Sequence, residues 1–256
     1  MSAKRQVTEC IEEQKMKQFV AEPSFWELFP DAEIGVVVVE NLDHPDQVSD
    51  ENQAELGKLL AEANKKADQH LNSNTISQNE VVAVWRDAFQ KFKTKKGARS
   101  SIENLLKRVL KGNPVGTITP TVDAYNTVSL TYALPVGGED IDKMDGDIRL
   151  TITEGGDQFR ALGDEEDAPT LEGELCYRDD AGAICRCWNW RDGQRTALND
   201  DTDRAFLIIE SVDPARSDDL AAATDLLAEL MTTYLGADVY AKAIITKDNP
   251  TMQIAD

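Results

Sequence analysis

The chain has 256 residues, of which 41% are hydrophobic and 29% charged, and its 47 acidic against 27 basic residues give a formal net charge of −20. No apolar run approaches the ~18 residues that a membrane-spanning helix needs, so the composition excludes a transmembrane protein and favours a soluble globular one. Because such an acidic surface repels phosphate on average, any contact with RNA must be local and basic.

Residues 1–17 mix acidic and basic side chains with few apolar ones. This pattern differs from the apolar core of a signal peptide and from an acid-poor transit peptide, so we expect a cytoplasmic protein. The cysteines are Cys10, Cys176, Cys185 and Cys187. Three of them fall in predicted strands without a fourth ligand for zinc, so we expect buried thiols, and a hairpin closing at 181–182 would set Cys176 opposite Cys187.

In chain order, we predict a polar lead-in over residues 1–24 and then one domain over residues 25–256. The run Ile-Gly-Val-Val-Val-Val at 34–39 is rich in β-branched residues, which predicts a buried strand. Helical spacing of leucine and alanine begins at Ser49 and stops in the polar residues 72–75. It therefore predicts a helix with one apolar face.

Two capping boxes follow, Ser77 with Glu80 and Ser100 with Glu103, and each predicts the start of a helix. Residues 91–111, which we call the basic segment, hold eight lysines and arginines in twenty-one positions of an otherwise acidic chain. The segment either offers a landing place for phosphates or only balances neighbouring acids. Its candidate RNA-binding residues are Lys93, Lys95, Lys96 and Arg99.

Short strands dominate the rest of the chain. They are predicted at 127–134, 148–153, 174–178, 183–190 and 205–212, separated by glycine-containing turn signals. A final helix begins at Asp218 or Asp219 and ends at Gly236. This order of elements predicts an α+β fold with a mixed β-sheet, N-terminal helices packed on it and a C-terminal helix, rather than a doubly wound sheet.

Four uncommon strings carry the functional interpretation. They are Thr-Val-Asp-Ala-Tyr-Asn-Thr-Val-Ser-Leu at 121–130, Leu-Pro-Val-Gly-Gly-Glu-Asp at 134–140, Met-Asp-Gly-Asp-Ile at 144–148 and Trp-Asn-Trp-Arg at 188–191. In this order and spacing the chain resembles stand-alone B3/4 domain proteins, over a core of residues 85–214. The first three strings also resemble the B3/4 editing module of the phenylalanyl-tRNA synthetase beta subunit.

The resemblance implies a pocket of aminoacyl size that hydrolyses the ester of a wrong amino acid on tRNA. The expected function is a trans-acting aminoacyl-tRNA deacylase or a tRNA-binding, editing-like protein, with tRNA and an amino acid or aminoacyl ester as partners. The alternative is a non-catalytic binding module for an aromatic or other small amino-acid-like ligand. A third interpretation is an RNA-binding or interaction protein that kept the fold and lost the pocket.

The candidate catalytic residues are two glycines and two carboxylates. Gly137 and Gly138 would supply backbone donors for an oxyanion, or else form a tight turn that needs positive φ. Glu139 and Glu174 would orient a water molecule or bind an amino group. The only histidines, His44 and His70, lie outside the matched region, so an imidazole base is not expected.

Six further residues are predicted to bind substrate. Asn126 is placed in the middle of a strand, where it would either contact substrate or hold the adjacent loop. In an alternating strand Trp188 and Trp190 would share one face, with at least one of them in the core as the alternative. Asn189 and Arg191 would share the other face, unless Arg191 pairs with a nearby acid. The aspartates from 140 to 147 either contribute to the site or form a solvated loop, and their spacing does not fit a calcium loop, so no metal or cofactor is expected. The predicted substrate-binding residues are Asn126, Ser129, Asp140, Trp188, Asn189 and Arg191.

The sequence departs from the synthetase at two places that bear on specificity. Gly137 stands where the synthetase turn carries histidine, and residues 188–196 replace a glycine-rich segment that contributes a substrate-sensing glutamate there. Specificity for tyrosine is therefore not carried over to this chain. The amino acid, the tRNA, the occurrence of hydrolysis and the oligomeric state are left open by the sequence.

Overall fold

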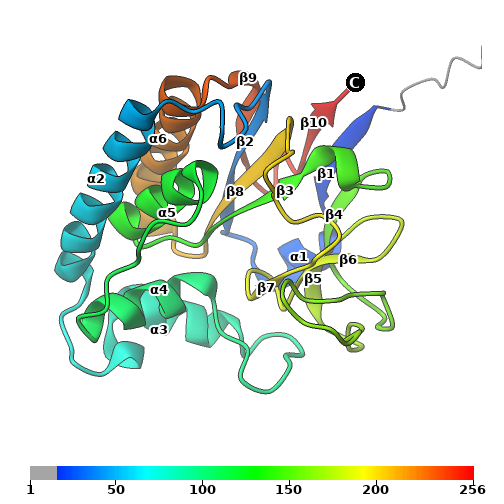
Figure 1. Cartoon of the computed structure of the whole chain (residues 1–256). Helices are drawn as coiled ribbons and strands as arrows, with labels where there is room; N and C mark the ends of the chain where they lie inside the picture. The colour runs from blue at the N-terminus through cyan, green and yellow to red at the C-terminus, as the bar shows by residue number, and fades with distance from the viewer. Residues whose placement is uncertain (1–15) are drawn as a thin grey trace, which may run out of the picture.

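The computed structural model describes residues 16–256, so Cys10 and most of the predicted lead-in lie outside the described residues. Over this range the chain forms two β-sheets with helices packed on them, which confirms the predicted α+β class (Figure 1). None of the described helices is long and apolar enough to cross a membrane.

One sheet has four antiparallel strands, in the order β3 (Val136–Asp140), β8 (Ala205–Ser211), β2 (Glu33–Glu40) and β9 (Asp238–Ile245). Side chains alternate between its two faces. Leu207 and Ile209 of β8 pack in the core beneath the helices, whereas Phe206 and Ile208 belong to the core between the sheets. The predicted strands at 34–39 and 205–212 are confirmed.

Three long helices cover the outer face of this sheet (Figure 1). They are α2 (Asp50–Ala67), α5 (Pro120–Tyr132) and α6 (Ser217–Leu235). Ser49 caps α2, as its position predicts, because its hydroxyl accepts from the Asn52 N–H at 3.2 Å. A Cβ on Gly35 would lie 2.1 Å from Oγ1 of Thr224, so the glycine allows α6 to approach β2 closely.

The other sheet has six strands, in the order β10 (Thr251–Ala255), β1 (Lys17–Ala21), β4 (Ile148–Ile152), β5 (Leu175–Arg178), β6 (Ala183–Arg186) and β7 (Arg191–Asp192). β1 pairs antiparallel with β10 and parallel with β4. Residues 17–21 therefore belong to the sheet, although they fall within the predicted lead-in of residues 1–24. Their alternation explains why, since Phe19 and Ala21 point into the core.

Shorter helices and an aromatic cluster complete the core between the sheets. The helices are α1 (Pro23–Leu28), α3 (Glu80–Ala88) and α4 (Ser101–Leu110), with 3₁₀ turns η1 (Asp68–His70), η2 (Ile76–Gln78), η3 (Ile141–Lys143) and η4 (Pro214–Arg216). Trp188 lies at the centre of the cluster, with ring centroids 5.4 Å from Phe25, 4.7 Å from Phe29 and 5.0 Å from Trp85. Buried aromatic surface of this kind dominates core energetics.

The predicted strand at 127–134 is wrong, because most of this stretch is the C-terminal part of α5. Thr119 caps the helix through a 3.4 Å bond from the Val122 N–H, and Pro120 is pre-organised for the first helical position. Ala124 and Val128 pack in one core and Leu130 in the other. A helix that is buried on several sides loses the apolar stripe by which it is recognised, so its β-branched residues suggested a strand.

The two capping boxes fare differently. α3 begins at Glu80, and Asn79 rather than Ser77 holds the N-cap position, so the first box is wrong. Ser100 does hold the N-cap of α4, but its hydroxyl makes no capping bond. Glu103 instead forms a bidentate ion pair with Arg86 of α3, at 2.5 and 3.0 Å, which ties the two helices together.

Candidate functional site

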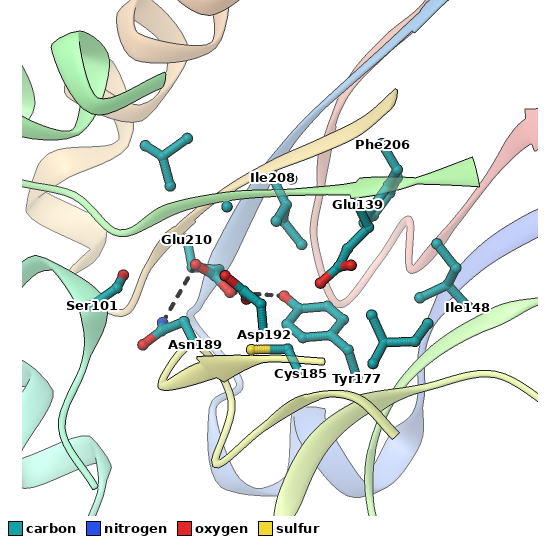
Figure 2. A pocket seen from close by; sticks show the side chains of 14 residues that line it. Ser101, Glu139, Ile148, Tyr177, Cys185, Asn189, Asp192, Phe206, Ile208 and Glu210 are labelled. Atoms are coloured by element: carbon teal, nitrogen blue, oxygen red, sulfur yellow. Dashed lines mark hydrogen bonds between the residues drawn. The ribbon is translucent and has the colours of Figure 1, made fainter. Parts of the chain in front are cut away.

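A pocket lies between the two sheets, and we call it the intersheet pocket (Figure 2). Its cavity volume is about 50 Å³, so it is a small cavity beside the ~300–1,000 Å³ of typical small-molecule sites. The four-stranded sheet contributes Gly137, Glu139, Phe206, Ile208 and Glu210. The six-stranded sheet contributes Ile148, Tyr177, Ile184, Cys185 and Asp192, and the lining is extended by Ser101 and Asn189.

Strand register explains why these side chains meet. Gly137 pairs with Ile208 and Glu139 with Phe206, so the odd-numbered residues of β3 and the even-numbered residues of β8 share the inner face. Across the pocket, Tyr177 pairs with Cys185, and Cys185 pairs in turn with Asp192. The pocket is thus walled by two facing sheets, each presenting one side of its pleat.

Glu210 is buried in this pocket and held by two neighbours. Its carboxyl group accepts a 2.9 Å bond from the Tyr177 hydroxyl and a 3.4 Å bond from the side-chain amide of Asn189 (Figure 2). Burial raises the pKa of Glu210 to about 8, against smaller lowering effects of Tyr177 and Asn189. The free pocket therefore holds this carboxyl group largely protonated at neutral pH.

Glu139 points into the same space and is only 6% exposed (Figure 2). Burial, followed by the nearby Asp192 carboxylate, holds the pKa of Glu139 well above its usual range, against opposing effects of Thr196 and Arg195. Its Oε2 atom has no hydrogen-bond partner among the described residues, and neither does the buried Oδ1 atom of Asn189. Two buried polar atoms of the lining are thus open to a ligand.

Asp192 is the third carboxyl group of the lining and the one that water reaches. Desolvation by the surrounding protein raises the pKa of Asp192, against smaller lowering effects of Cys185 and Arg191. The lining holds three carboxylic residues and no lysine, arginine or histidine. Its electrostatic character is therefore acidic throughout.

The two glycines of β3 face in opposite directions. Neither has positive φ, so the tight-turn alternative is wrong. The Asp140 N–H donates to the Thr196 carbonyl on the edge of β3 away from β8, at 2.8 Å. Since alternate N–H groups of a strand point the same way, that of Gly138 lies on this outer edge and that of Gly137 points toward β8. Gly138 is therefore the better placed of the two as a donor.

Replacement of Gly137 by alanine is expected to stabilise the fold while narrowing the pocket. The added Cβ would meet only Cγ2 of Ile208, at 3.8 Å, so it fits without strain. Because glycine within a strand costs roughly 0.5–1 kcal/mol relative to alanine, we expect a gain of about that size in the free energy of unfolding. Urea denaturation measures it.

Gly138→Ala is the matched control for that measurement. Its Cβ would come within 2.7 Å of Leu207 and 2.8 Å of Leu198, so we expect a smaller gain or a loss. A destabilisation by Gly137→Ala as large as that by Gly138→Ala would contradict the open space assigned beside Gly137.

Glu174 does not line the pocket, contrary to the role predicted for it. It is fully buried and pairs with Arg186 through bonds of 2.9 and 2.5 Å, and it also accepts from the Leu171 and Cys187 N–H groups. Burial acts to raise the pKa of Glu174, but Arg186 and these donors together bring it below its usual range. Glu174 holds loops together in the folded chain rather than facing the pocket.

Three other predicted substrate-binding residues also lie outside the lining. Asn126 is buried on α5, not in a strand. The Ser129 hydroxyl donates to the Leu134 carbonyl at 2.6 Å, which closes the end of that helix. Asp140 caps η3 and accepts from the Thr202 hydroxyl at 3.0 Å. Ser129 and Asp140 are thus accounted for by local hydrogen bonds.

The Trp-Asn-Trp-Arg string is a turn rather than a continuation of β6. Cys187 and Trp188 have φ angles of 47° and 65°, in the left-handed region that residues other than glycine rarely adopt. The turn buries Trp188 in the aromatic core and brings Asn189 to the pocket, as predicted for Asn189. Arg191 points away and pairs with Asp164 at 3.2 Å, so the predicted sharing of one face is wrong.

The register of the β5–β6 ladder changes the cysteine geometry. The predicted pairing of Cys176 with Cys187 would place Arg186 opposite Tyr177, but Cys185 lies there, so the expected facing of the two cysteines does not occur. Cys176, Cys185 and Cys187 are buried free thiols. Burial raises the pKa of all three, which makes them poor nucleophiles and agrees with the expectation of small buried thiols.

The basic segment adjoins the pocket. The Lys95 N–H donates to Sγ of Cys187 at 3.4 Å, and the Ser101 N–H donates to the carbonyl of Asn189 at 3.1 Å. All eight cations of the segment are exposed, and none has an ion-pair partner within the described part of the chain. They are therefore not consumed by balancing nearby acids.

The lining residues that sequence reasoning missed include Tyr177, Asp192 and Glu210. Glu210 did carry a signal, since it is an acid within the apolar run 205–212 and shares the period-2 face of Phe206 and Ile208. Asp192 preceded a glycine and was interpreted as part of a turn. Tyr177 gave no signal, because a tyrosine in a buried strand is ordinary.

Comparison with known proteins places this geometry in context. Residues 84–235, more than half of the chain, match the model of a family described as the B3/4 domain. The fold is also similar to a crystal structure of an N-terminal fragment of the phenylalanyl-tRNA synthetase beta-subunit from Pyrococcus horikoshii, with 12% sequence identity and a TM-score of 0.48. That alignment covers 94% of this chain and 56% of the fragment, so the chain spans little more than half of the fragment. No curated protein matches the chain.

Proposed function

This chain belongs to the B3/4 domain family, and on that premise we propose that it is a trans-acting aminoacyl-tRNA deacylase. One observation carries the proposal: a segment of eight exposed cations without ion-pair partners among the described residues adjoins the intersheet pocket. The segment would bind tRNA phosphates, and the pocket would receive the aminoacyl group.

Hydrolysis would use the groups nearest the mouth. Asp192 keeps contact with water and would accept a proton from the water that attacks the ester carbonyl. The outward N–H of Gly138 would donate to the developing oxyanion. The C–O bond to the ribose then breaks, the ribose oxygen takes up the proton and the free amino acid leaves.

Asp192→Asn is expected to lower the rate of deacylation by about 10²-fold or more, because an amide cannot accept that proton. The measurement is release of the amino acid from a panel of mischarged tRNAs, under single-turnover conditions. Glu166→Gln is the matched control, since Glu166 is an exposed acid outside the lining. Equal rates for Asp192→Asn and the wild-type protein would overturn the catalytic assignment.

Neutralising the basic segment should weaken tRNA binding and its dependence on salt. We expect Lys93→Gln, Lys95→Gln and Lys96→Gln together to lower the slope of log K against log [salt] by up to about 2–3, since each phosphate contact contributes about 0.7–0.9. Lys143→Gln, Lys242→Gln and Lys247→Gln change the charge equally at exposed sites outside the segment. An equal effect of the two triple variants would remove the segment from the interface.

A second candidate is a non-catalytic binding protein for an amino-acid-like ligand. It is favoured by the absence of histidine from the lining and by the direction of the Gly137 N–H, which points toward β8 rather than toward a ligand. Binding of aminoacyl-tRNA that is abolished by pocket variants, without turnover of any charged tRNA, would decide for this candidate.

A further inference from the structure

We propose that the intersheet pocket selects ligands that carry a primary ammonium group on an apolar body and have no free carboxylate. The source of the ligand rests on the proposed function. If the protein is a deacylase, the ligand is the aminoacyl ester, and the free amino acid is rejected. The same chemistry also admits amino-acid amides and simple alkylamines.

The charges around the pocket favour a cationic ligand over an anionic one. Three carboxyl groups line it, and the arginines nearest to them are already paired with other acids. Arg191 pairs with Asp164, and Arg195 holds Asp179 in a bidentate pair at 2.7 Å. A carboxylate entering the pocket would therefore find no cationic partner, whereas an ammonium group would find carboxyl and amide oxygens that can accept its hydrogen bonds.

The hydrogen-bonding atoms of the lining favour a ligand that donates hydrogen bonds. Glu139 is more than nine-tenths buried, and its carboxyl group is directed into the pocket (Figure 2). Its Oε2 atom has no hydrogen-bond partner among the described residues. Asn189 uses its NH₂ group on Glu210, and its buried Oδ1 atom has no hydrogen-bond partner among the described residues, so it remains available as an acceptor. An ammonium group has three donors and no acceptor, which matches a lining rich in carboxyl and amide oxygens.

The spacing of the carboxyl groups argues for an organic cation over a metal ion. Within residues 16–256, no group of three or more histidine, cysteine, aspartate or glutamate side chains is arranged to hold a metal. The lining also holds the apolar side chains of Ile148, Phe206 and Ile208. A ligand with a charged end and a short hydrocarbon body satisfies both parts of the lining.

The proton content of the free pocket supports the same ligand. Burial raises the pKa of Glu139 and Glu210, so the empty pocket holds these groups largely neutral instead of carrying uncompensated charge. An ammonium group placed among them would favour their ionised forms, and binding would release protons to the solvent. A carboxylate ligand would instead favour the protonated forms of these groups, and its binding would take up protons from the solvent.

Titration calorimetry on the full chain with four matched compounds tests the inference without tRNA or turnover. L-leucine, L-leucinamide, 3-methylbutylamine and 4-methylpentanamide share one hydrocarbon body and differ in their charged groups. We expect L-leucinamide and 3-methylbutylamine to bind at least about tenfold more tightly than L-leucine. We expect no binding of 4-methylpentanamide, because it has no ammonium group. Binding of leucine as tight as that of leucinamide would overturn the inference.

Variants assign the binding to the pocket. Glu210→Gln keeps the shape of the side chain but cannot ionise, so leucinamide should bind at least about tenfold more weakly. Glu166→Gln should bind it as the wild-type protein does, and thermal melting of each variant checks that it is folded. Unchanged affinity in a folded Glu210→Gln variant would place the ammonium group elsewhere and overturn the assignment.

A comparison on tRNA separates this inference from the proposed function. N-acetylated aminoacyl-tRNA has the ester but no ammonium group, so it should be deacylated far more slowly than the free-amine form. Equal turnover of the two would keep the deacylase and overturn the ammonium site. Tight binding of leucinamide without turnover of any charged tRNA would keep the ammonium site and overturn the deacylase.

Discussion

Glu174→Gln is expected to lower the free energy of unfolding by about 3–5 kcal/mol, because it leaves the Arg186 guanidinium buried without a counter-charge. The side chains of the pair are 0% and 2% exposed, so water cannot replace the missing partner. The substitution also removes the negative charge that accepts hydrogen bonds from the N–H groups of Leu171 and Cys187, each at 2.9 Å. Chemical denaturation of the purified variant measures the loss.

A double-mutant cycle supplies the control. Arg186→Met combined with Glu174→Gln removes both charges, so the double variant should be more stable than the sum of the two single losses implies. Additive losses would show that the pair contributes no coupling. Since Glu174 lies outside the pocket, the folded fraction of Glu174→Gln should bind leucinamide as the wild-type protein does, which tests the corrected placement of this residue.

The difference in stability between the wild-type protein and Glu210→Gln is expected to depend strongly on pH. Burial raises the pKa of Glu210 from 4.5 to about 8, so between these values the folded state holds a proton that the unfolded state has lost. The stabilisation is fully present below the lower value and is lost as pH rises through the upper one. The difference should fall by about 1.4 kcal/mol per pH unit within that window.

Urea denaturation at several pH values between 5 and 9, in steps of about one unit, gives this difference directly. Glutamine stays neutral at every pH, so subtracting the two curves removes the contributions of all other titrating groups. Asp238→Asn, which removes an acid at an exposed site on β9, is the control variant over the same range. A flat curve for Glu210→Gln would show that Glu210 titrates normally and that its burial is less complete than the geometry indicates.

Much of the fold was accessible from the sequence where one local signal dominated. The β-branched run 34–39 and the apolar run 205–212 became strands as predicted, and Ser49 began a helix as a capping residue should. The same reasoning failed at α5, because contact with two cores removed the periodicity that marks a helix. β1 was missed because this strand is short, shows few alternating residues and follows a polar stretch.

The site was accessible only in part, for a different physical reason. Glu139 and Asn189 were found because they lie in distinctive strings, and both line the pocket. Asp192 and Glu210 come from different sheets, and only the packing of the two sheets brings them to one cavity. The left-handed turn at Cys187 also reversed the expected directions of Trp188 and Arg191, since backbone of that kind is not signalled by non-glycine residues.

The exposed cations of the basic segment lie on a molecule whose net charge is −20, so the protein carries a marked electric dipole. A polyanion that approaches from most directions is repelled, and one that approaches the segment is attracted. Productive collisions are thereby restricted to a narrow range of orientations, in which the polyanion arrives beside the mouth of the cavity. Added salt shortens the reach of both fields, so it would slow the encounter and also relax this orientational restriction.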